Sequence, residues 1–198
     1  RAIRDVYKRQ SLVRSHNTTQ ASMAQQIKLC SIADAAKILG YHNSPLGQES
    51  VYSANSLNPP MTIGSVQASP LTVANVYATL GADGVACDPI AIKRVIDKNG
   101  KRLRVPSAHC HQAIPKGIAQ TAAYALNQGV VQPGGEASTT QLDGGRKTFA
   151  KTGTNEQYYM TTAGFVPYQV ASFVAVGNAE SQKSFNGMTI NGRTMAAW

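Results

Sequence analysis

A lysine flanked by hydroxyl-bearing residues and a glycine stands late in the chain, in the stretch Lys151-Thr152-Gly153-Thr154. An ammonium and two hydroxyls on one strand edge can hold a carboxylate by charge-assisted hydrogen bonds. The glycine lets a ligand backbone approach closely, and an exposed edge can pair with an extended peptide. We therefore interpret residues 151–154 as a site for the C-terminal carboxylate of a peptide. The plain alternative is an ordinary strand start with an exposed lysine.

A second candidate lies near the start of the chain, where Ser15-His16-Asn17 directly precedes an expected helix. Ser-x-x-Lys, Ser-x-Asn and Lys-Thr-Gly form the signature of one class of serine acyl-transfer enzymes. Ser-x-Asn is common by chance, so its weight comes from its order along the chain and its position at a helix start. No serine of the chain has a lysine three residues later.

The elements that must position these residues follow from the hydrophobic pattern and the capping residues. Helical spacing appears around 18–30 and 31–40, the second with Ser31 as the expected cap. The clearest helix has Ser69 as its cap, Pro70 in its first position and Gly81 or Gly84 at its end. A further helix begins at Pro115. Segments 146–154, 159–166 and 168–177 read as three strands, so helices followed by an antiparallel meander predict an α+β domain.

Charge and composition narrow the functional classes. The chain of 198 residues carries a net charge of +9, and 42% of its residues are hydrophobic, which suits one globular domain. The densest basic cluster falls on a hairpin expected at 89–105, with Asn99-Gly100 as its turn. No nucleic-acid motif accompanies this cluster, so we expect a solvated charged hairpin and no nucleic-acid partner.

Three cysteines stand at positions 30, 87 and 110 without a metal-site spacing, and we expect no metal and no cofactor. The local stretch His109-Cys110-His111 does not fit a site, because neighbours on a strand point to opposite faces. Cys87 and Cys110 flank the expected hairpin, where a disulfide would staple its two ends. Two free buried thiols remain the alternative.

The chain resembles the later portion of the transpeptidase domain of a bifunctional, class A penicillin-binding protein. The stretches that carry this resemblance span about residues 15–192 and are SHNTT, IADAAKILGY, TIGSVQASPLTVANVYATLGADGVACDPIAIKRVIDKNGK, GVVQPGG and GRKTFAKTGTNEQ with the strands after it. The resemblance implies a penicillin-binding-protein/β-lactamase-like fold with an antiparallel sheet packed against helices. It also implies peptidoglycan D,D-transpeptidase activity through an acyl-enzyme, in an enzyme of the serine-type D-Ala-D-Ala class.

The same resemblance implies a role for each motif residue. Ser15 would relay protons between two lysines, and Asn17 would hydrogen-bond the amide of the acyl group. Lys151 would supply positive potential. The hydroxyls of Thr152 and Thr154 would bind a terminal D-Ala or β-lactam carboxylate, and the Thr154 N–H would form half of an oxyanion hole. Gly153 completes the substrate-binding strand.

The missing Ser-x-x-Lys motif, which lies upstream of Ser-x-Asn in the family, is the main departure. We therefore expect a fragment that is incomplete at both ends and inactive by itself, because a nucleophile cannot be replaced by positioning groups. Residues 1–10 show no clear period and are expected to be a non-native or disordered leader, which leaves 11–198 as a partial transpeptidase domain. The partners implied are peptidoglycan stem peptides or a lipid-linked precursor, and β-lactams. The parent is expected to be membrane-anchored, with this domain on the extracytoplasmic face of the bacterial cell membrane.

Two other functions stay open at this point. A class A β-lactamase would need a Glu-x-x-x-Asn spacing, and none of the candidate glutamates, Glu49, Glu136, Glu156 and Glu180, has an asparagine four residues on. A non-catalytic module that binds wall peptides would keep the pocket without the chemistry. Acylation of a full-length parent by a fluorescent penicillin separates an enzyme from a binding module.

Overall fold

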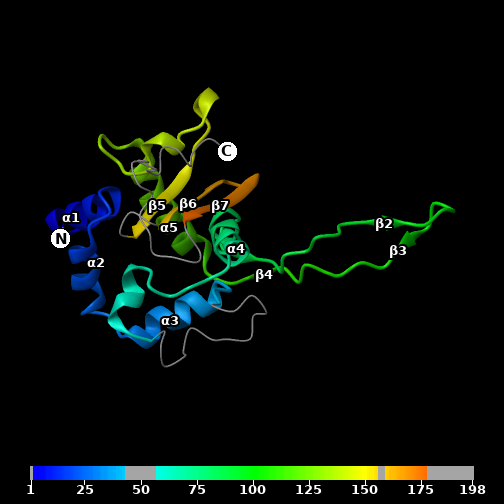
Figure 1. Cartoon of the computed structure of the whole chain (residues 1–198), viewed down its shortest axis with the longest axis horizontal. Coiled ribbons are helices and arrows are strands. Elements are labelled where there is room, and N and C mark those ends of the chain that lie inside the picture. The colour runs from blue at the N-terminus through cyan, green and yellow to red at the C-terminus, as the bar shows by residue number, and fades with distance from the viewer. Residues whose placement is uncertain (1, 43–56, 156–158, 178–198) are drawn as a thin grey trace.

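The computed structural model describes residues 2–42, 57–155 and 159–177, with side chains from Lys8 onward in the first helix. Helices come first along the chain and the main sheet comes last, as the α+β prediction requires (Figure 1). The α-helices of the described part are α1 (Ala2–Val13), α2 (Asn17–Ala24), α3 (Leu29–Ile38), α4 (Pro70–Gly81) and α5 (Lys116–Val131). Short 3-10 helices are η1 (Pro59–Ile63), η2 (Ser138–Thr140) and η3 (Asp143–Gly145).

The main sheet has three antiparallel strands in the order β5 (Phe149–Asn155), β6 (Tyr159–Val166) and β7 (Val170–Gly177). Its register pairs Lys151 with Ala163 across β5 and β6, and Ala163 with Phe173 across β6 and β7. Among the described residues β5 pairs only with β6, so the strand that carries the lysine motif forms an edge of the sheet. The three predicted strands are confirmed.

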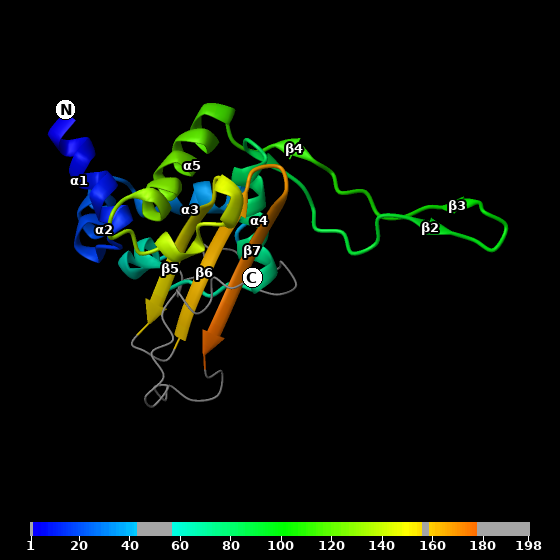
Figure 2. The same ribbon diagram turned by 90° about the horizontal axis from the view of Figure 1, so that it is seen from above.

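The core forms where α4 and α5 pack against the sheet (Figure 2). Phe165 of β6 is 1% exposed, and its ring stacks on Phe149 with centroids 4.8 Å apart. Tyr77 of α4 meets the same ring edge to face at 6.4 Å. Burial raises the pKa of Tyr77 to about 12. These rings fix α4 against β6, while Val130 of α5 packs with Ala150 of β5.

Helix ends agree with the sequence where a capping residue is strong. The Ser69 side chain accepts a 3.1 Å hydrogen bond from the Thr72 N–H, with Pro70 in the first turn, which confirms the predicted start of α4. Helix α3 begins at Leu29, not after Ser31, because the chain is already helical one turn earlier. It ends at a left-handed glycine, Gly40, with φ of +79°.

Residues 1–10 were expected to be a non-native or disordered leader, and the structure differs from disorder there, since Ala2–Val13 form helix α1. Half of its twelve residues are good helix formers, and Ile3, Val6 and Val13 recur at helical spacing. The helix is held at its end, where Ser11 and Val13 are 1% and 5% exposed. Because these buried residues lie beyond residue 10, the first ten residues alone show only part of the helical spacing.

The loop between α4 and α5 extends far from the rest of the protein as a long two-stranded arm (Figures 1 and 2). At its base β1 (Val85–Ala86) pairs with β4 (His111–Gln112), and at its tip β2 (Val95–Ile96) pairs with β3 (Arg102–Leu103). The predicted hairpin is therefore present. Its turn is wider than a tight Asn-Gly pair, because the Asp97 carboxylate accepts hydrogen bonds from the N–H groups of Asn99 and Lys101.

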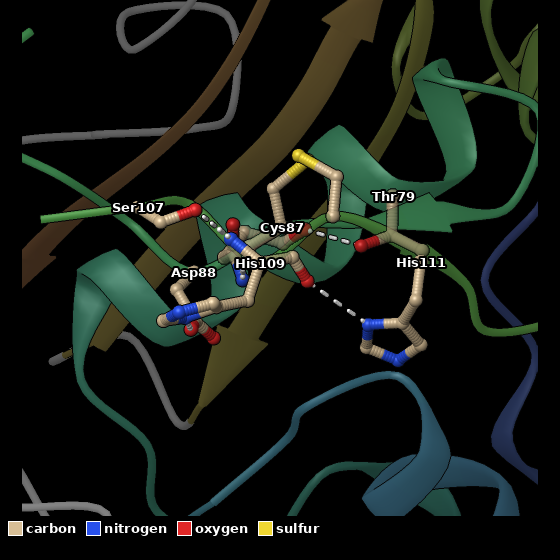
Figure 3. The surroundings of a disulfide bond; sticks show 8 residues. Thr79, Cys87, Asp88, Ser107, His109 and His111 are labelled. Carbon is tan, nitrogen blue, oxygen red and sulfur yellow. Dashed lines mark hydrogen bonds and ion pairs between the residues drawn. A yellow bond between two sulfur atoms is a disulfide. The ribbon is translucent and has the colours of Figure 1, made fainter.

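A disulfide joins Cys87 to Cys110 at the base of this arm, with their Cα atoms 4.1 Å apart (Figure 3). The expected pair is thus bonded, and Cys30 lies exposed on α3. Beside the disulfide, His109 Nδ1 lies 2.8 Å from the Asp88 carboxylate (Figure 3). These bonds close the arm at its base and leave the remainder projecting.

One aspartate ties together the ends of three elements. The Asp83 carboxylate lies 2.8 Å from the Lys116 ammonium at the start of α5. It also accepts hydrogen bonds from Gln120 of α5 and from the hydroxyl of Tyr168, in the turn between β6 and β7. The hydrogen bond from Lys116, followed by that from Tyr168, lowers the pKa of Asp83. The C-terminal end of α4 is therefore fixed to both neighbours.

Candidate active site

The lysine motif lies within edge strand β5, as the sequence predicts. Strand alternation places Lys151 and Gly153 on one face and Thr152 and Thr154 on the other. The two threonines therefore share a face, which suits two hydroxyls that act on one group. Thr154 is exposed, and Thr152 is half-buried.

Ser15 stands at the turn that ends α1. The His16 N–H donates to the Ser11 carbonyl at 2.9 Å, and the Ser15 N–H donates to the Leu12 carbonyl at 3.3 Å. This hydrogen-bond pair defines a Schellman motif, whose turn residue is left-handed and is usually glycine. Ser15 adopts this conformation with φ of +54°. A serine side chain is thus held at a position that costs backbone energy, about 1–2 kcal/mol for a residue with a Cβ.

The two motifs meet through their side chains. The Lys151 ammonium donates to the Ser15 hydroxyl at 2.6 Å, across 136 residues of sequence. It also donates to the Thr152 carbonyl at 2.7 Å. Because this ammonium reaches a residue outside the sheet, the contact indicates that the Thr152 carbonyl points away from β6. The Thr154 N–H then faces the same open edge, since backbone groups two residues apart in an antiparallel strand point alike.

Partial burial changes the pKa of Lys151. Loss of water around the ammonium lowers the pKa of Lys151, and the negative charge of Glu136 acts in the opposite direction. The sequence brings up Glu136 only as a glutamate without an asparagine four residues on, and not as a neighbour of Lys151. Its only local signal is its place directly after the Gly134-Gly135 pair, which by itself does not indicate a role.

The loop that carries Glu136 also holds Ser15 in place. Its Glu136 N–H donates to the Val13 carbonyl at the end of α1, at 3.0 Å. A side chain at Gly134 would overlap the Arg14 guanidinium, and one at Gly135 would overlap the Gly129 carbonyl of α5. Gly135 is therefore required where this loop lies against α5, and the φ of +70° favours glycine at Gly134 because the Arg14 side chain could move aside. A gap too narrow for a water molecule separates α1, α5 and β5 beside Lys151.

The remaining predicted site residues take the following places. Asn17 is the first residue of α2 and is exposed, two positions beyond the serine that contacts the lysine. The space beside Gly153 is filled by its neighbour on β6, because a Cβ there would overlap the Thr161 hydroxyl. Packing within the sheet is thus a second reason for a glycine here, beside the expected approach of a ligand.

The described residues contain no group of three or more histidine, cysteine or acidic side chains able to hold a metal. In the stretch around Cys110, His109 faces Asp88, and His111 Nδ1 donates to the His109 carbonyl at 3.3 Å. Within the described ranges, no helix is both long enough and apolar enough to cross a bilayer.

Comparison with known families decides the classification. The model of the penicillin binding protein transpeptidase domain matches residues 4–197. The chain belongs to this family. The match includes most of α1, so the helix that precedes Ser15 lies within the matched range.

Individual curated relatives of the chain are also penicillin-binding proteins. The chain is 26% identical over 163 residues to penicillin-binding protein 1A of Aquifex aeolicus, covering 82% of this chain and 20% of the relative. It is 32% identical over 140 residues to penicillin-binding protein 1A of Mycobacterium tuberculosis, covering 67% and 16% of the two chains. The chain thus spans about a fifth of the length of these curated relatives.

Solved structures share the fold of this transpeptidase-domain chain. The PonA1 protein of Mycobacterium tuberculosis in complex with penicillin V superposes with a TM-score of 0.76 at 25% identity, covering 89% of this chain and 48% of that one. Penicillin-binding protein 1A of Haemophilus influenzae gives a TM-score of 0.75 at 19% identity, covering 96% and 32%. The predicted fold class, a penicillin-binding transpeptidase fold with helices and antiparallel strands, is confirmed.

Proposed function

We propose that this chain forms the carboxylate-binding and proton-relay side of a D,D-transpeptidase active site that cross-links peptidoglycan stem peptides. The observation that carries the proposal is the 2.6 Å contact between Lys151 and Ser15, which unites the Lys-Thr-Gly and Ser-x-Asn motifs. The acylated serine belongs to a Ser-x-x-Lys motif that these 198 residues do not contain. The chain alone is therefore inactive in acyl transfer, and the parent protein is an acyltransferase of the serine type.

The relay works through the direction of one hydrogen bond. Because the Lys151 ammonium donates to the Ser15 oxygen, the serine keeps its own hydroxyl proton to donate elsewhere. That proton can pass to the leaving group when the acyl-enzyme forms, and the Ser15 oxygen then takes a proton from the Lys151 ammonium. Burial around Lys151 lowers its pKa, which makes proton exchange with the serine easier.

Strand β5 binds the carboxylate of the substrate. The hydroxyls of Thr152 and Thr154 donate to the carboxylate of the terminal D-alanine, or to that of a β-lactam. The positive charge of the half-buried Lys151 strengthens this capture, since partial removal of water increases the attraction. The Thr154 N–H at the open edge supplies one donor for the oxyanion of the tetrahedral intermediate. Asn17, at the start of α2, positions the amide of the acyl group.

The remaining proposals concern the parent protein and its surroundings. Its substrates are stem peptides on peptidoglycan or on a lipid-linked precursor, and β-lactams acylate it as substrate mimics. We place the domain on the extracytoplasmic face of a membrane-anchored parent. The Cys87–Cys110 disulfide supports this compartment, because such bonds persist outside the reducing cytoplasm.

The test is acylation by a fluorescent penicillin of a parent protein that contains this chain together with its Ser-x-x-Lys segment. Thr154→Val removes one hydroxyl and keeps the β-branched shape of the strand residue. A hydrogen bond to a charged group contributes about 1.5–3 kcal/mol, so acylation should slow by roughly ten- to a hundred-fold. Thr152→Val should also slow it, and Lys151→Ala should cost more.

Thr121→Val on the exposed side of α5 is the matched control, because it removes a hydroxyl that bonds only the Gly117 carbonyl of its own helix. Its acylation rate should equal that of the unmodified protein. Equal rates for Thr154→Val and Thr121→Val would refute the carboxylate assignment. Rapid release of the hydrolysed penicillin would instead favour a β-lactamase-like hydrolase.

A further inference from the structure

We propose that the arm, defined as residues 89–109, docks an acidic, extended segment of a separate protein partner, which adds to the arm as a further β-strand. The first observation is charge. The arm holds one acidic residue, Asp97, and six basic ones, which leaves five of the nine net positive charges of the chain within 21 positions. The six basic residues, all exposed, are Lys93, Arg94, Lys98, Lys101, Arg102 and Arg104.

These basic side chains are not neutralised within the described structure. Its ion pairs are His109 with Asp88 and Lys116 with Asp83, neither of which involves the six. The side chain of Asp97 instead accepts hydrogen bonds from the backbone of its own turn. The projecting ribbon therefore presents uncompensated positive charge, which favours an anionic partner.

The second observation is exposed aliphatic surface between the charges. Ile92 is 53% exposed, and Ile96 and Leu103 are each 47% exposed. In the ribbon Ile96 lies opposite Arg102, so apolar and cationic side chains share a face. A soluble anionic polymer would use the charges but would leave this aliphatic surface in water. A protein surface with alternating acidic and aliphatic residues covers both.

The third observation is unpaired backbone. Strands β2 and β3 pair over two residues each at the tip, and the next backbone bond toward the base joins the Asp88 N–H to the Ala108 carbonyl. Between these points, residues 89–94 and 104–107 make no backbone–backbone hydrogen bond with any described residue. A two-stranded ribbon of this kind is marginal alone, and an added strand supplies the missing bonds.

The same observations weigh against the other anionic partners. Unpaired backbone groups cannot enter the hydrocarbon of a membrane without a large cost, so lipid insertion is disfavoured. The disulfide at the base of the arm is suited to an oxidising compartment, where nucleic acids are not the usual partners. An acidic protein segment satisfies the charge, the aliphatic surface and the backbone together.

The experiment uses the full 198-residue chain, with its disulfide intact, and a fluorescein-labelled peptide of about ten alternating glutamate and valine residues, the length of a long strand. Fluorescence anisotropy should show binding that weakens when salt rises from about 0.05 to 0.5 M. A peptide in which every valine is replaced by proline keeps the charge and cannot pair as a strand. It should bind at least ten-fold more weakly.

The arm variant is Arg94→Gln, Arg102→Gln and Arg104→Gln combined, and the control combines Lys28→Gln, Lys37→Gln and Arg146→Gln, exposed positions outside the arm. Both remove three positive charges. The arm variant should lose about ten-fold in affinity, while the control should change less than two-fold. Hydrogen exchange on the unmodified chain should show new protection of amides in 89–94 or 104–107 when the valine peptide binds.

Equal losses in the two triple variants, equal binding of the proline peptide, or no new amide protection would each overturn the proposal. Absence of binding by the valine peptide would do the same. If vesicles rich in phosphatidylglycerol or a soluble polyphosphate displace the peptide and depend on the arm arginines more strongly, the partner is a lipid or a polymer and not a protein strand. The hydrogen-exchange measurement needs no variant, so it tests strand addition to the arm even if the arm variant fails to fold.

Discussion

The left-handed serine at the end of α1 allows a test by stability measurements on the chain as it stands. Ser15→Ala and Ser15→Gly both remove the hydroxyl that accepts from Lys151. They differ only in the Cβ, which is unfavourable at φ of +54°. The glycine variant should therefore be more stable than the alanine variant by about 1 kcal/mol. In an ordinary helical position the order would be reversed by about 0.5–1 kcal/mol.

Urea unfolding at fixed pH measures this difference. With a slope of about 2 kcal/mol per molar, 1 kcal/mol separates the two midpoints by roughly 0.5 M. Helix α3 provides an internal calibration, because Gly40 holds the equivalent place: the Tyr41 N–H donates to the Ala36 carbonyl at 2.9 Å. Its φ is +79° and a Cβ would meet nothing within 4 Å, so Gly40→Ala reports the backbone cost alone.

The reasoning fails if Ser15→Ala proves as stable as Ser15→Gly while Gly40→Ala shows the expected loss of about 1 kcal/mol. That result would mean that Ser15 is not held in the left-handed region. If the expected order is found, the serine persists at a position where the backbone conformation favours glycine. The hydroxyl is then the reason for its presence, in keeping with strain at functional sites.

Three further predictions concern packing and pH. Gly81→Ala should lower the free energy of unfolding by about 1–3 kcal/mol, because its Cβ would lie 2.8 Å from the buried ring of Phe165. Gly129→Ala should raise the free energy of unfolding by about 0.5–1 kcal/mol, because its Cβ would make contacts of 3.7 Å or more, and thermal unfolding measures both variants. Burial lowers the pKa of Lys151, so the folded protein binds fewer protons than the unfolded chain just below 10.5, and stability should gain with rising pH there. Urea titrations of Lys151→Met should show that this gain is absent. The pKa of Asp83 is lowered from 3.8, so its stabilisation should be lost as pH falls below that value, and acid unfolding followed by circular dichroism should show a smaller loss in Asp83→Asn.

The elements that the sequence predicts correctly are those governed by local chemistry. Ser69 and Pro70 mark the start of α4 because capping and the fixed φ of proline act within one turn. The three strands of the sheet are rich in β-branched and aromatic residues, so the sequence predicts them as β-strands. In contrast, α1 is stabilised by burial of Ser11 and Val13 against distant elements, which no ten-residue window contains.

The site shows the same division. The motif residues could be named because short signatures preserve their types, and the pairing of Lys151 with Ser15 follows from knowing that the motifs work together. The influence of Glu136 on Lys151 could not be predicted, since it depends on a loop folded against the end of α1. The packing of Gly153 could not be predicted either, because its neighbour Thr161 is known only once the strand register is fixed.

The closed base of the arm has a consequence for how the protein tolerates change. The chain leaves α4 and returns to α5 through β1 and β4, which lie side by side and are bonded by the disulfide. Everything between Cys87 and Cys110 is therefore an insert whose ends stay fixed whatever its length or covalent continuity. A protease cut at the tip would leave both halves attached in oxidising conditions, and a longer, shorter or foreign loop could replace the arm. The fold thus provides a ready point for grafting a foreign loop, far from the strand that carries Lys151.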